Sequence, residues 1–415
     1  MRAEGVFALG LWRTRPWRLL NRRFNRMIIC VLAVVALAAC AGVARKNAVP
    51  EDLTTQAVVP GMADVRYRSG IDQKEILREG IASFYREQAY LASRGHREAM
   101  PPAVFLAISG GGDNGAFGAG LLNGWTVAGN RPEFKLVTGV STGALIAPFA
   151  FLGPAYDDEL KRFYTTVSPS DVAIRRWFLA AITSDALTDN APLWKLVENA
   201  VDQALLDAIA VEYEKGRLLL VATVDLDARQ SVLWNMTKIA ASRDSKALDL
   251  FRSILIASAA IPVAFPPVMI DVEAHGHEYQ EMHVDGGTMS QVFVYPPSLR
   301  VGETSDKYHV VRERKLYVIR NARLDPEWAS VERRTMTIGE RAISSLIHTQ
   351  GIGDLYTIYL TSKRDGVDYN LAFIPASFDA PHQENFDTEY MRALFRTGFD
   401  MSAKGYPWEK TPPGF

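Results

Sequence analysis

Short apolar runs alternate with amphipathic stretches along most of this chain. Residues 104–109 (VFLAIS), 135–140 (KLVTGV) and 217–225 (RLLLVATVD) are almost continuously apolar, as expected for strands buried on both faces of a parallel sheet. A helix is predicted after each of the first two runs, ending near Ala128 and near Leu152. Two strand–helix units in succession predict an α/β fold with a mostly parallel central sheet.

Weaker patterns predict the remaining elements. Apolar residues at helical spacing over 72–94 predict an amphipathic helix packed on the domain. The region 157–213 is helical in pattern and holds aromatic residues that are candidates for lining an acyl channel, although ordinary core packing also explains them. Further strands are expected at 230–236, 268–272, 282–284, 315–319 and 369–374, and further helices at 247–260 and 339–361.

Two segments lack such patterns. Residues 41–71 are polar and irregular, and they predict a tether. Residues 407–415 contain three prolines and predict a loosely held end.

The first forty residues resemble a bacterial export signal. Seven arginines precede a run of thirteen apolar residues, 27–39, which is short for a bilayer span and right for a signal peptide. The run ends in Leu-Ala-Ala-Cys40, which resembles the lipobox of bacterial lipoproteins. Cys40 would then become the lipidated (for example palmitoylated) N-terminus, and Met27 or a nearby codon is an alternative start. The alternative is an ordinary signal peptide or anchor with a stray cysteine.

Composition narrows the location and the partners. The residue after Cys40 is Ala41 and not Asp. By resemblance to lipoprotein sorting in Gram-negative bacteria, this suggests the outer membrane, facing the periplasm. Residues 41–415 hold 39 basic and 46 acidic residues, a net charge of −7, which argues against nucleic acid as a partner. Cys30 and Cys40 are the two cysteines, so loss of the first and lipidation of the second would leave no disulfide.

The segment Gly139-Val140-Ser141-Thr142-Gly143 joins a predicted strand to a predicted helix. G-x-S-x-G in this context is the nucleophile-elbow pattern, in which a sharp turn lifts the serine hydroxyl out of the sheet. A Cβ at either glycine would collide with the adjacent strand or helix, and the helix start directs its positive end at the hydroxyl. The alternative is a tight turn with an incidental serine.

The glycine loop 110–115 after the first strand admits three interpretations. Its G-x-G-x-x-G spacing matches a dinucleotide fingerprint, but Glu133, the acidic residue at about the expected distance, precedes the second strand instead of following it. A phosphate loop would need Gly-Lys-Ser/Thr, which the loop lacks. Successive unhindered amides for an oxyanion are the third interpretation, and only this one explains a serine elbow thirty residues later.

A serine nucleophile needs a base. His309, His348 and His382 lie C-terminal enough for a triad, but none has a distinctive neighbourhood. Asp285 ends an apolar strand and is followed by Gly286 and Gly287, so the chain can turn beside a charged group; a simple turn is the alternative. His275, His277 and His283 make an unconvincing zinc site, and we interpret them as solvated loop residues and predict no metal.

Four features in this order resemble the patatin-like phospholipase family: the glycine loop, the elbow, residues 257–262 (ASAAIP), and Asp285-Gly286-Gly287. The resemblance implies a three-layer α/β/α fold and a Ser–Asp dyad, with Ser141 as nucleophile, Asp285 as base, and no catalytic histidine or cofactor. It implies hydrolysis of acyl esters of phospholipids or other membrane lipids through an acyl-serine. The implied oxyanion hole comprises Gly110, Gly111, Gly112, Asn114 and Gly115. The family usually has Arg or Lys where Asn114 stands, which bears on rate and substrate.

The resulting domain prediction has five parts. They are a signal peptide (1–39), a lipidated tether (40–71), an N-terminal helix packed on the domain (72–102), a patatin-like domain (103–380) and a C-terminal extension (381–415). A non-lipid carboxylesterase or thioesterase on the same dyad is the enzymatic alternative. A catalytically idle envelope scaffold or binding module is the alternative from another class.

Overall fold

The computed structural model of the chain describes residues 45–96, 99–176 and 184–415. The predicted signal peptide and Cys40 lie outside these residues. Arg45–Arg176 and Ala186–Phe415 form one compact unit. Within the described residues, no helix is both long enough and apolar enough to cross a bilayer.

Nine strands form the main sheet of the described chain, and two short strands pair separately. In chain order the strands are β1 (Arg66–Arg68), β2 (Ala103–Ile108), β3 (Leu136–Val140), β4 (Ile174–Arg175), β5 (Thr188–Asp189), β6 (Leu218–Asp225), β7 (Gln230–Asn235), β8 (Val268–Ala274), β9 (His277–Asp285), β10 (Arg314–Arg320) and β11 (Asp368–Phe373).

The sheet has the order β1-β7-β6-β3-β2-β10-β11. The five strands from β6 to β11 are mutually parallel, and β7 and β1 continue the sheet through antiparallel pairings. The hairpin β8–β9 joins through β9, whose last residues pair antiparallel with the end of β6. The α/β class with a mostly parallel sheet is therefore confirmed.

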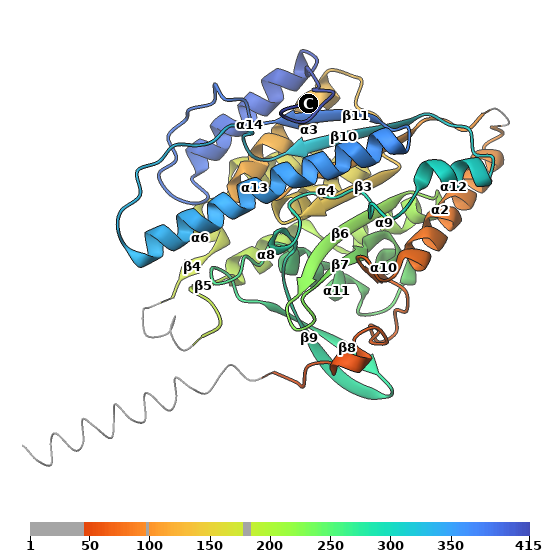
Figure 1. Cartoon of the computed structure of the whole chain (residues 1–415), viewed down its shortest axis with the longest axis horizontal. Helices are drawn as coiled ribbons and strands as arrows, with labels where there is room; N and C mark the ends of the chain where they lie inside the picture. The colour runs from red at the N-terminus through yellow and green to blue at the C-terminus, as the bar shows by residue number, and fades with distance from the viewer. Residues whose placement is uncertain (1–44, 97–98, 177–183) are drawn as a thin grey trace, which may run out of the picture. The chain divides into compact units, whose positions relative to one another are not determined.

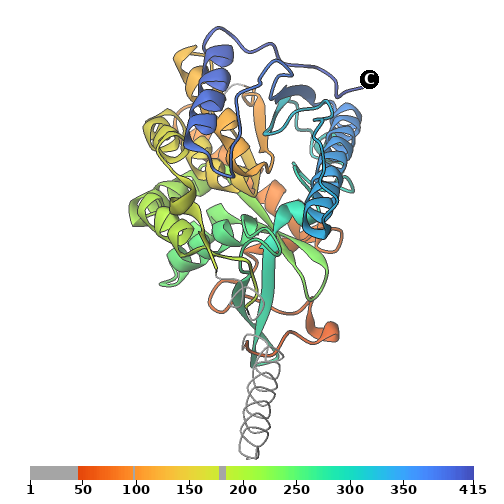
Figure 2. The ribbon, with the colours of Figure 1, turned by 90° about the vertical axis from the view of Figure 1, so that its left-hand side faces the viewer.

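Helices cover both faces of the sheet and make the three layers (Figures 1 and 2). They are α2 (Gln73–Ser93), α3 (Gly115–Val127), α4 (Thr142–Leu152), α5 (Asp157–Thr165), α6 (Pro169–Val172), α8 (Ala191–Ala200), α9 (Gln203–Glu214), α10 (Met236–Ser242), α11 (Ala247–Ser258), α12 (Val301–Lys307), α13 (Thr335–Arg364) and α14 (Thr388–Ala403).

Alternate residues of the central strands serve different layers, as the twofold period of a strand requires. Leu106 and Ile108 of β2 lie in the larger core with α3, α4, α11 and α14, whereas Ala107 lies in the smaller core under α13. Both sets are apolar because both faces are covered, which is why the central strands could be recognised as continuous apolar runs.

A glycine seam joins α14 to α3. A Cβ at Gly120 would collide with the carbonyl of Phe395, and one at Gly124 would collide with that of Phe399. A Cβ at Gly398 would in turn collide with the carbonyl of Phe117. Because these positions lack side chains, the backbones of the two helices approach closely along the seam.

The predicted tether is wrong for residues 45–71. Arg66–Arg68 forms β1 on β7, and the amide and carbonyl of Val58 bond to Glu273 at 2.9 Å each. The guanidinium of Arg66 is buried against Glu281 in an ion pair. Isolated apolar residues such as Val59 and Val65 fill the core from this segment, and they are too widely spaced to give a periodic signal.

The prediction of a loosely held end is also wrong. Leu371 of β11 and Glu409 exchange two backbone hydrogen bonds of 2.8 and 3.0 Å. The ring of Trp408 lies 4.8 Å from those of both Trp125 and Tyr317. The prolines confine this segment to an extended path that suits an edge pairing.

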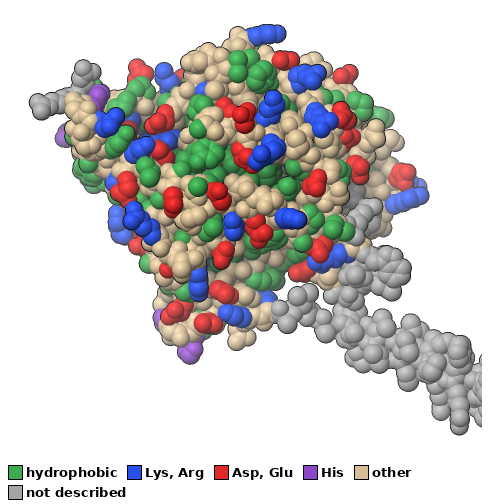
Figure 3. Space-filling model, turned by 180° about the vertical axis from the view of Figure 1, so that it is seen from behind, with side chains coloured by type: hydrophobic (Ala, Val, Ile, Leu, Met, Phe, Trp, Pro, Cys, Tyr) green, Lys and Arg blue, Asp and Glu red, His purple; other side chains and the backbone are tan. Residues whose placement is uncertain are grey.

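Charged side chains of both signs are interspersed over the face seen from behind in Figure 3, without a patch of one sign.

Candidate active site

Ser141 occupies a strained turn between β3 and α4. Its backbone angles are φ 55° and ψ −127°, a region that a residue with a side chain rarely adopts. Gly139 and Gly143 permit the turn, because a Cβ at Gly139 would meet the backbone of Gly143 and one at Gly143 would meet the carbonyls of Ile108 and Ser109. The elbow geometry predicted for these glycines is present.

Ser258, the last residue of α11, supports the elbow from below. Its hydroxyl accepts a hydrogen bond from the amide of Ser141 at 3.0 Å and donates one to the carbonyl of Ala222 at 2.7 Å. Ser258 is completely buried, so no solvent can replace it. The sequence pointed to the segment that contains Ser258 only as a family feature, and this bridge between α11, β6 and the strained serine gives it a physical role.

The hydroxyl of Ser141 donates a hydrogen bond of 2.6 Å to Oδ2 of Asp285. Oδ1 of Asp285 accepts one of 2.7 Å from the amide of Gly287, which orients the carboxylate. Asp285 is held beside Ser141 because β9 pairs with β6 at Thr223 and because its own amide donates to the carbonyl of Ala260 at 2.9 Å. Residues 144 positions apart thus meet.

Burial raises the pKa of Asp285 to about 6, while the hydrogen bonds from Ser141 and Gly287 oppose the rise. The ionised carboxylate loses hydration in this site and recovers only part of it from two donors. A carboxylate with such a pKa is ionised at pH 7 and is a stronger proton acceptor than an exposed aspartate.

The glycine loop offers fewer amide donors than the sequence predicted. The amide of Gly110 donates to the carbonyl of Gln291 at 3.0 Å, and that of Asn114 donates to Gly111 at 3.1 Å. The amide of Gly115 is engaged within the same turn. The prediction that the amides of these three residues bind the oxyanion is therefore wrong, because their N–H groups already donate to carbonyls of the loop and of Gln291.

The amides of Gly111 and Gly112 have no acceptor in the described part of the chain. Gly112 has φ 59° and lines the same cavity as Ser141. A Cβ at Gly111 would collide with the carbonyl of Asn321, so glycine is required there. These two amides are left as candidates for binding an oxyanion.

Residues after β11 hold the glycine loop from outside. Oδ2 of Asp113 bonds to Nε2 of His382 at 2.7 Å and accepts from the amide of Phe386 at 2.8 Å. The hydroxyl of Tyr390 donates to Oδ1 of Asn114 at 2.7 Å. The side chain of Asn114 is therefore engaged with α14, which accounts for an uncharged residue at this position.

The sequence offered no signal for these contacts, since His382 lies 269 residues from Asp113. The bond to Asp113 raises the pKa of His382. His382 thus holds the loop and does not contact Ser141, whose hydroxyl has Asp285 as its partner in the described residues.

A small apolar cavity of about 40 Å³ adjoins Ser141. Its walls come from α4, α5, α8, the end of α11 and the start of α14, and they include Leu145, Phe163, Leu193, Leu196, Phe265, Phe386 and Met391. Several of these residues belong to the predicted acyl-channel region 157–213. Phe386 has φ 62°. The hydrogen bond from its backbone amide to Asp113 holds it at the wall of the cavity.

His275 and His277 are exposed, as predicted, whereas His283 is not. His283 was predicted to be solvated and is instead fully buried, with Nδ1 2.9 Å from Thr223 Oγ1 and Nε2 3.1 Å from Glu281 Oε2. It lies in the buried end of β9, where Val284 and Asp285 are buried as well, so the polar stretch that precedes it in the sequence was misleading. No cluster of three or more potential metal ligands occurs in residues 45–96, 99–176 and 184–415.

Fold and site together define the class: a three-layer α/β protein with a serine on a strand–helix elbow at the carboxyl edge of a parallel sheet. Residues 106–297 match the family model described as patatin-like phospholipase. This part of the chain is a patatin-like phospholipase domain, and the family is one of lipid acyl hydrolases.

Among solved structures, the chain is similar to the crystal structure of VipD from Legionella pneumophila, with 12% sequence identity and a TM-score of 0.37. The match covers 74% of this chain and 67% of that chain. No curated protein matches the chain.

Proposed function

We propose that this protein is a serine acyl hydrolase that cleaves acyl esters of phospholipids or other lipids with a Ser141–Asp285 dyad. The observation that carries the proposal is the 2.6 Å hydrogen bond from the strained, buried Ser141 to Asp285. The family of residues 106–297 supports lipid esters as the substrate class.

In the proposed reaction Asp285 Oδ2 takes the proton of Ser141 as Oγ attacks the ester carbonyl carbon. The carbonyl oxygen becomes an alkoxide, which the free amides of Gly111 and Gly112 would bind. The C–O bond to the leaving alcohol then breaks, and Asp285 returns the proton to that alcohol. Water hydrolyses the acyl-serine in a second step with Asp285 again as base.

The size of the cavity favours a second candidate, a carboxylesterase or thioesterase acting on short acyl groups. About 40 Å³ accommodates roughly one water-sized group of about 30 Å³. A long acyl chain therefore requires Phe386 or its neighbours to move, whereas a short acyl group does not.

A chain-length series distinguishes the two candidates. Turnover of p-nitrophenyl esters from acetate to palmitate, and of phosphatidylcholine vesicles, is measured for wild type, Ser141→Ala and Asp285→Asn. Lipid hydrolysis predicts activity on long esters and vesicles, and the short-chain alternative predicts activity on acetate and butyrate alone. Absence of turnover together with absence of labelling by a fluorophosphonate probe would leave only a non-catalytic role.

We also propose that Cys40 is lipidated and anchors the protein in the bacterial envelope, facing the periplasm from the outer membrane. The proposal rests on the apolar run 27–39 ending at Cys40. The Cys40→Ser variant should leave the membrane fraction for the soluble fraction. Unchanged fractionation of that variant would contradict the anchor.

A further inference from the structure

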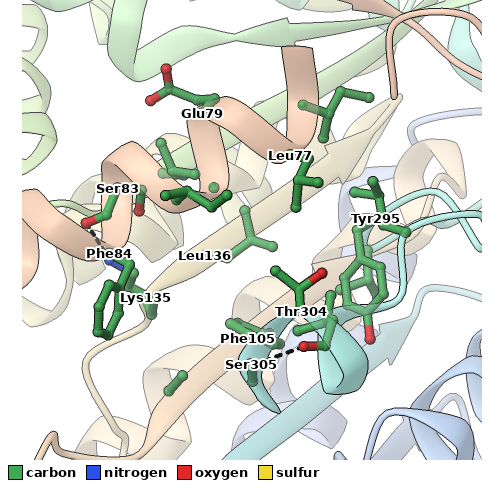
Figure 4. Close-up of a pocket in the computed structure, with 18 of the residues that line it drawn as sticks. Leu77, Glu79, Ser83, Phe84, Phe105, Lys135, Leu136, Tyr295, Thr304 and Ser305 are labelled. Atoms are coloured by element: carbon green, nitrogen blue, oxygen red, sulfur yellow. Dashed lines mark hydrogen bonds between the residues drawn. The ribbon is translucent and has the colours of Figure 1, made fainter. Parts of the chain in front are cut away.

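A second and larger cavity opens on the face of the sheet that carries α2 and α12. These helices do not meet above β3 and β6, and between them lies a cavity of about 220 Å³ (Figure 4). Its lining is mostly apolar and includes Leu77 of α2, Phe105, Leu136, Leu218 and Leu220 of the strands, and Tyr295. Apolar sheet surface of this kind is ordinarily covered.

This cavity lies away from Ser141. Leu136 and Leu218 are the first residues of β3 and β6 and pair with each other, whereas Ser141 follows the last residue of β3. The five residue steps from Leu136 to Ser141 span about 16 Å at 3.3 Å per residue. The cavity is thus at the amino edge of the parallel strands and the elbow at the carboxyl edge.

One cation on the lining has no carboxylate partner. Arg314, the first residue of β10, is half-buried and donates to Ser305 Oγ at 2.5 Å and to the carbonyl of Arg312 at 3.5 Å. It forms no ion pair within the described residues. Asp306 and Asp365 act on it only from a distance, and burial is the main cause of its lowered pKa.

The other charges nearby do not neutralise Arg314. Arg312 and Lys135, which also line the cavity, both bond to the single carboxylate of Glu87 at 2.8–2.9 Å. Glu79, the acidic residue of the lining, is engaged by Arg86 at 2.6 Å. The surroundings therefore carry an excess of positive charge beside an apolar cavity, which matches an anionic amphiphile.

We propose that this cavity binds a free fatty acid of medium chain length, with the alkyl chain over Leu136 and Leu220 and the carboxylate on the guanidinium of Arg314. A guanidinium binds a carboxylate through two parallel hydrogen bonds. A volume of about 220 Å³ accommodates on the order of seven groups of about 30 Å³. This number equals the alkyl carbons of a C8 acid and is about two short of those of a C10 acid. A two-chain phospholipid exceeds this volume.

The proposal does not depend on the hydrolase activity, although a fatty acid is also a product of the reaction proposed above. The test is titration calorimetry of the full chain with sodium decanoate, decanol and decyltrimethylammonium, each below its critical micelle concentration. Ser141→Ala is titrated in parallel and should bind decanoate as wild type does, so a failure of the proposed function leaves this measurement intact.

Arg314→Gln should weaken decanoate binding about tenfold or more, as expected for loss of a charge-assisted hydrogen bond, and should leave decanol binding unchanged. Leu136→Phe, which fills the cavity, should abolish binding of both ligands. Should it not fold, as judged by thermal melting, Leu77→Trp at the half-exposed wall replaces it. Leu145→Trp, which fills the cavity beside Ser141, is the matched control and should retain binding.

Three results would overturn the proposal. One is the absence of saturable decanoate binding to the wild type. Another is equal decanoate affinity in Arg314→Gln and wild type, or binding of decyltrimethylammonium to the wild type as tightly as decanoate. The third is loss of decanoate binding in Leu145→Trp together with retained binding in Leu136→Phe, which would place the ligand beside Ser141.

Discussion

Replacing Ser258 by Ala tests whether the strained elbow depends on support from α11. The change removes two hydrogen bonds, from Ser141 N and to Ala222 O, and leaves both backbone groups buried without those partners. Each such unsatisfied group costs about 1–3 kcal/mol. Some relaxation is expected, so we predict that the free energy of unfolding falls by about 2–4 kcal/mol.

The larger effect should fall on catalysis. Without the hydroxyl, the amide of Ser141 loses the acceptor that holds φ at 55°, and the serine can relax toward ordinary backbone angles. A displacement of about 1 Å between reacting groups costs on the order of a hundredfold in rate. We therefore expect kcat for an ester substrate to fall between tenfold and a hundredfold, with KM within about twofold because Ser258 does not line the cavity.

Ser402→Ala is the matched control. Ser402 is also almost fully buried, but its hydroxyl donates to the carbonyls of Gly398 and Phe399 in its own helix. Denaturant unfolding should show a loss of about 1 kcal/mol or less, and kcat should be unchanged. If Ser258→Ala lowers stability but leaves kcat at the wild-type value, the hydroxyl supports the fold alone and the reasoning about the elbow is wrong.

Three further predictions concern the carboxylate, the loop and the cavity. Since Asp285 must be ionised to accept a proton and burial raises its pKa to about 6, kcat/KM should fall about tenfold per pH unit below pH 6; a pH profile that stays flat to pH 5 would contradict this. The hydrogen bond to Asp113 raises the pKa of His382 in the folded protein. The contact therefore stabilises the folded state fully below the unfolded pKa of about 6.5, and this stabilisation is lost as pH rises through the folded pKa. His382→Gln should accordingly reduce the difference in Tm between pH 6 and pH 8, and an unchanged difference would argue against the contact. Phe386→Ala should enlarge the cavity beside Ser141 and raise kcat/KM for octanoate relative to acetate esters; an unaltered chain-length ratio would show that Phe386 does not limit the acyl group.

The sequence identified the elements whose signals are local. Continuous apolar runs marked β2, β3 and β6, and the spacing of glycines around Ser141 marked the elbow, because buried strands and strained turns each impose their own residue types. Asp285 was found by its position at a strand end. Its distance from Ser141 could be read only from the register of β9 on β6.

The parts that were missed depend on contacts between distant segments. Gly110 looks like a free amide in the sequence, and only the approach of the Gln291 carbonyl shows that it is engaged. Residues 45–71 and 407–415 gave polar or proline-rich patterns, yet each adds an extended segment to an edge of the sheet. Edge segments need only a few apolar residues, so their sequences show no hydrophobic periodicity that would predict them.

The glycine seam between α3 and α14 has a consequence for the order in which the chain acquires its structure. α3 begins where the glycine loop ends, and the helix that fits against it is made last. Asp113 and Asn114 likewise obtain their outer partners, His382 and Tyr390, only from this final segment. During synthesis the elbow of Ser141 can form well before the loop opposite it is held in place. The protein therefore carries an incomplete site until its last residues have emerged and docked, so a chain cut short before α14 would be inactive even though Ser141 and Asp285 are both present.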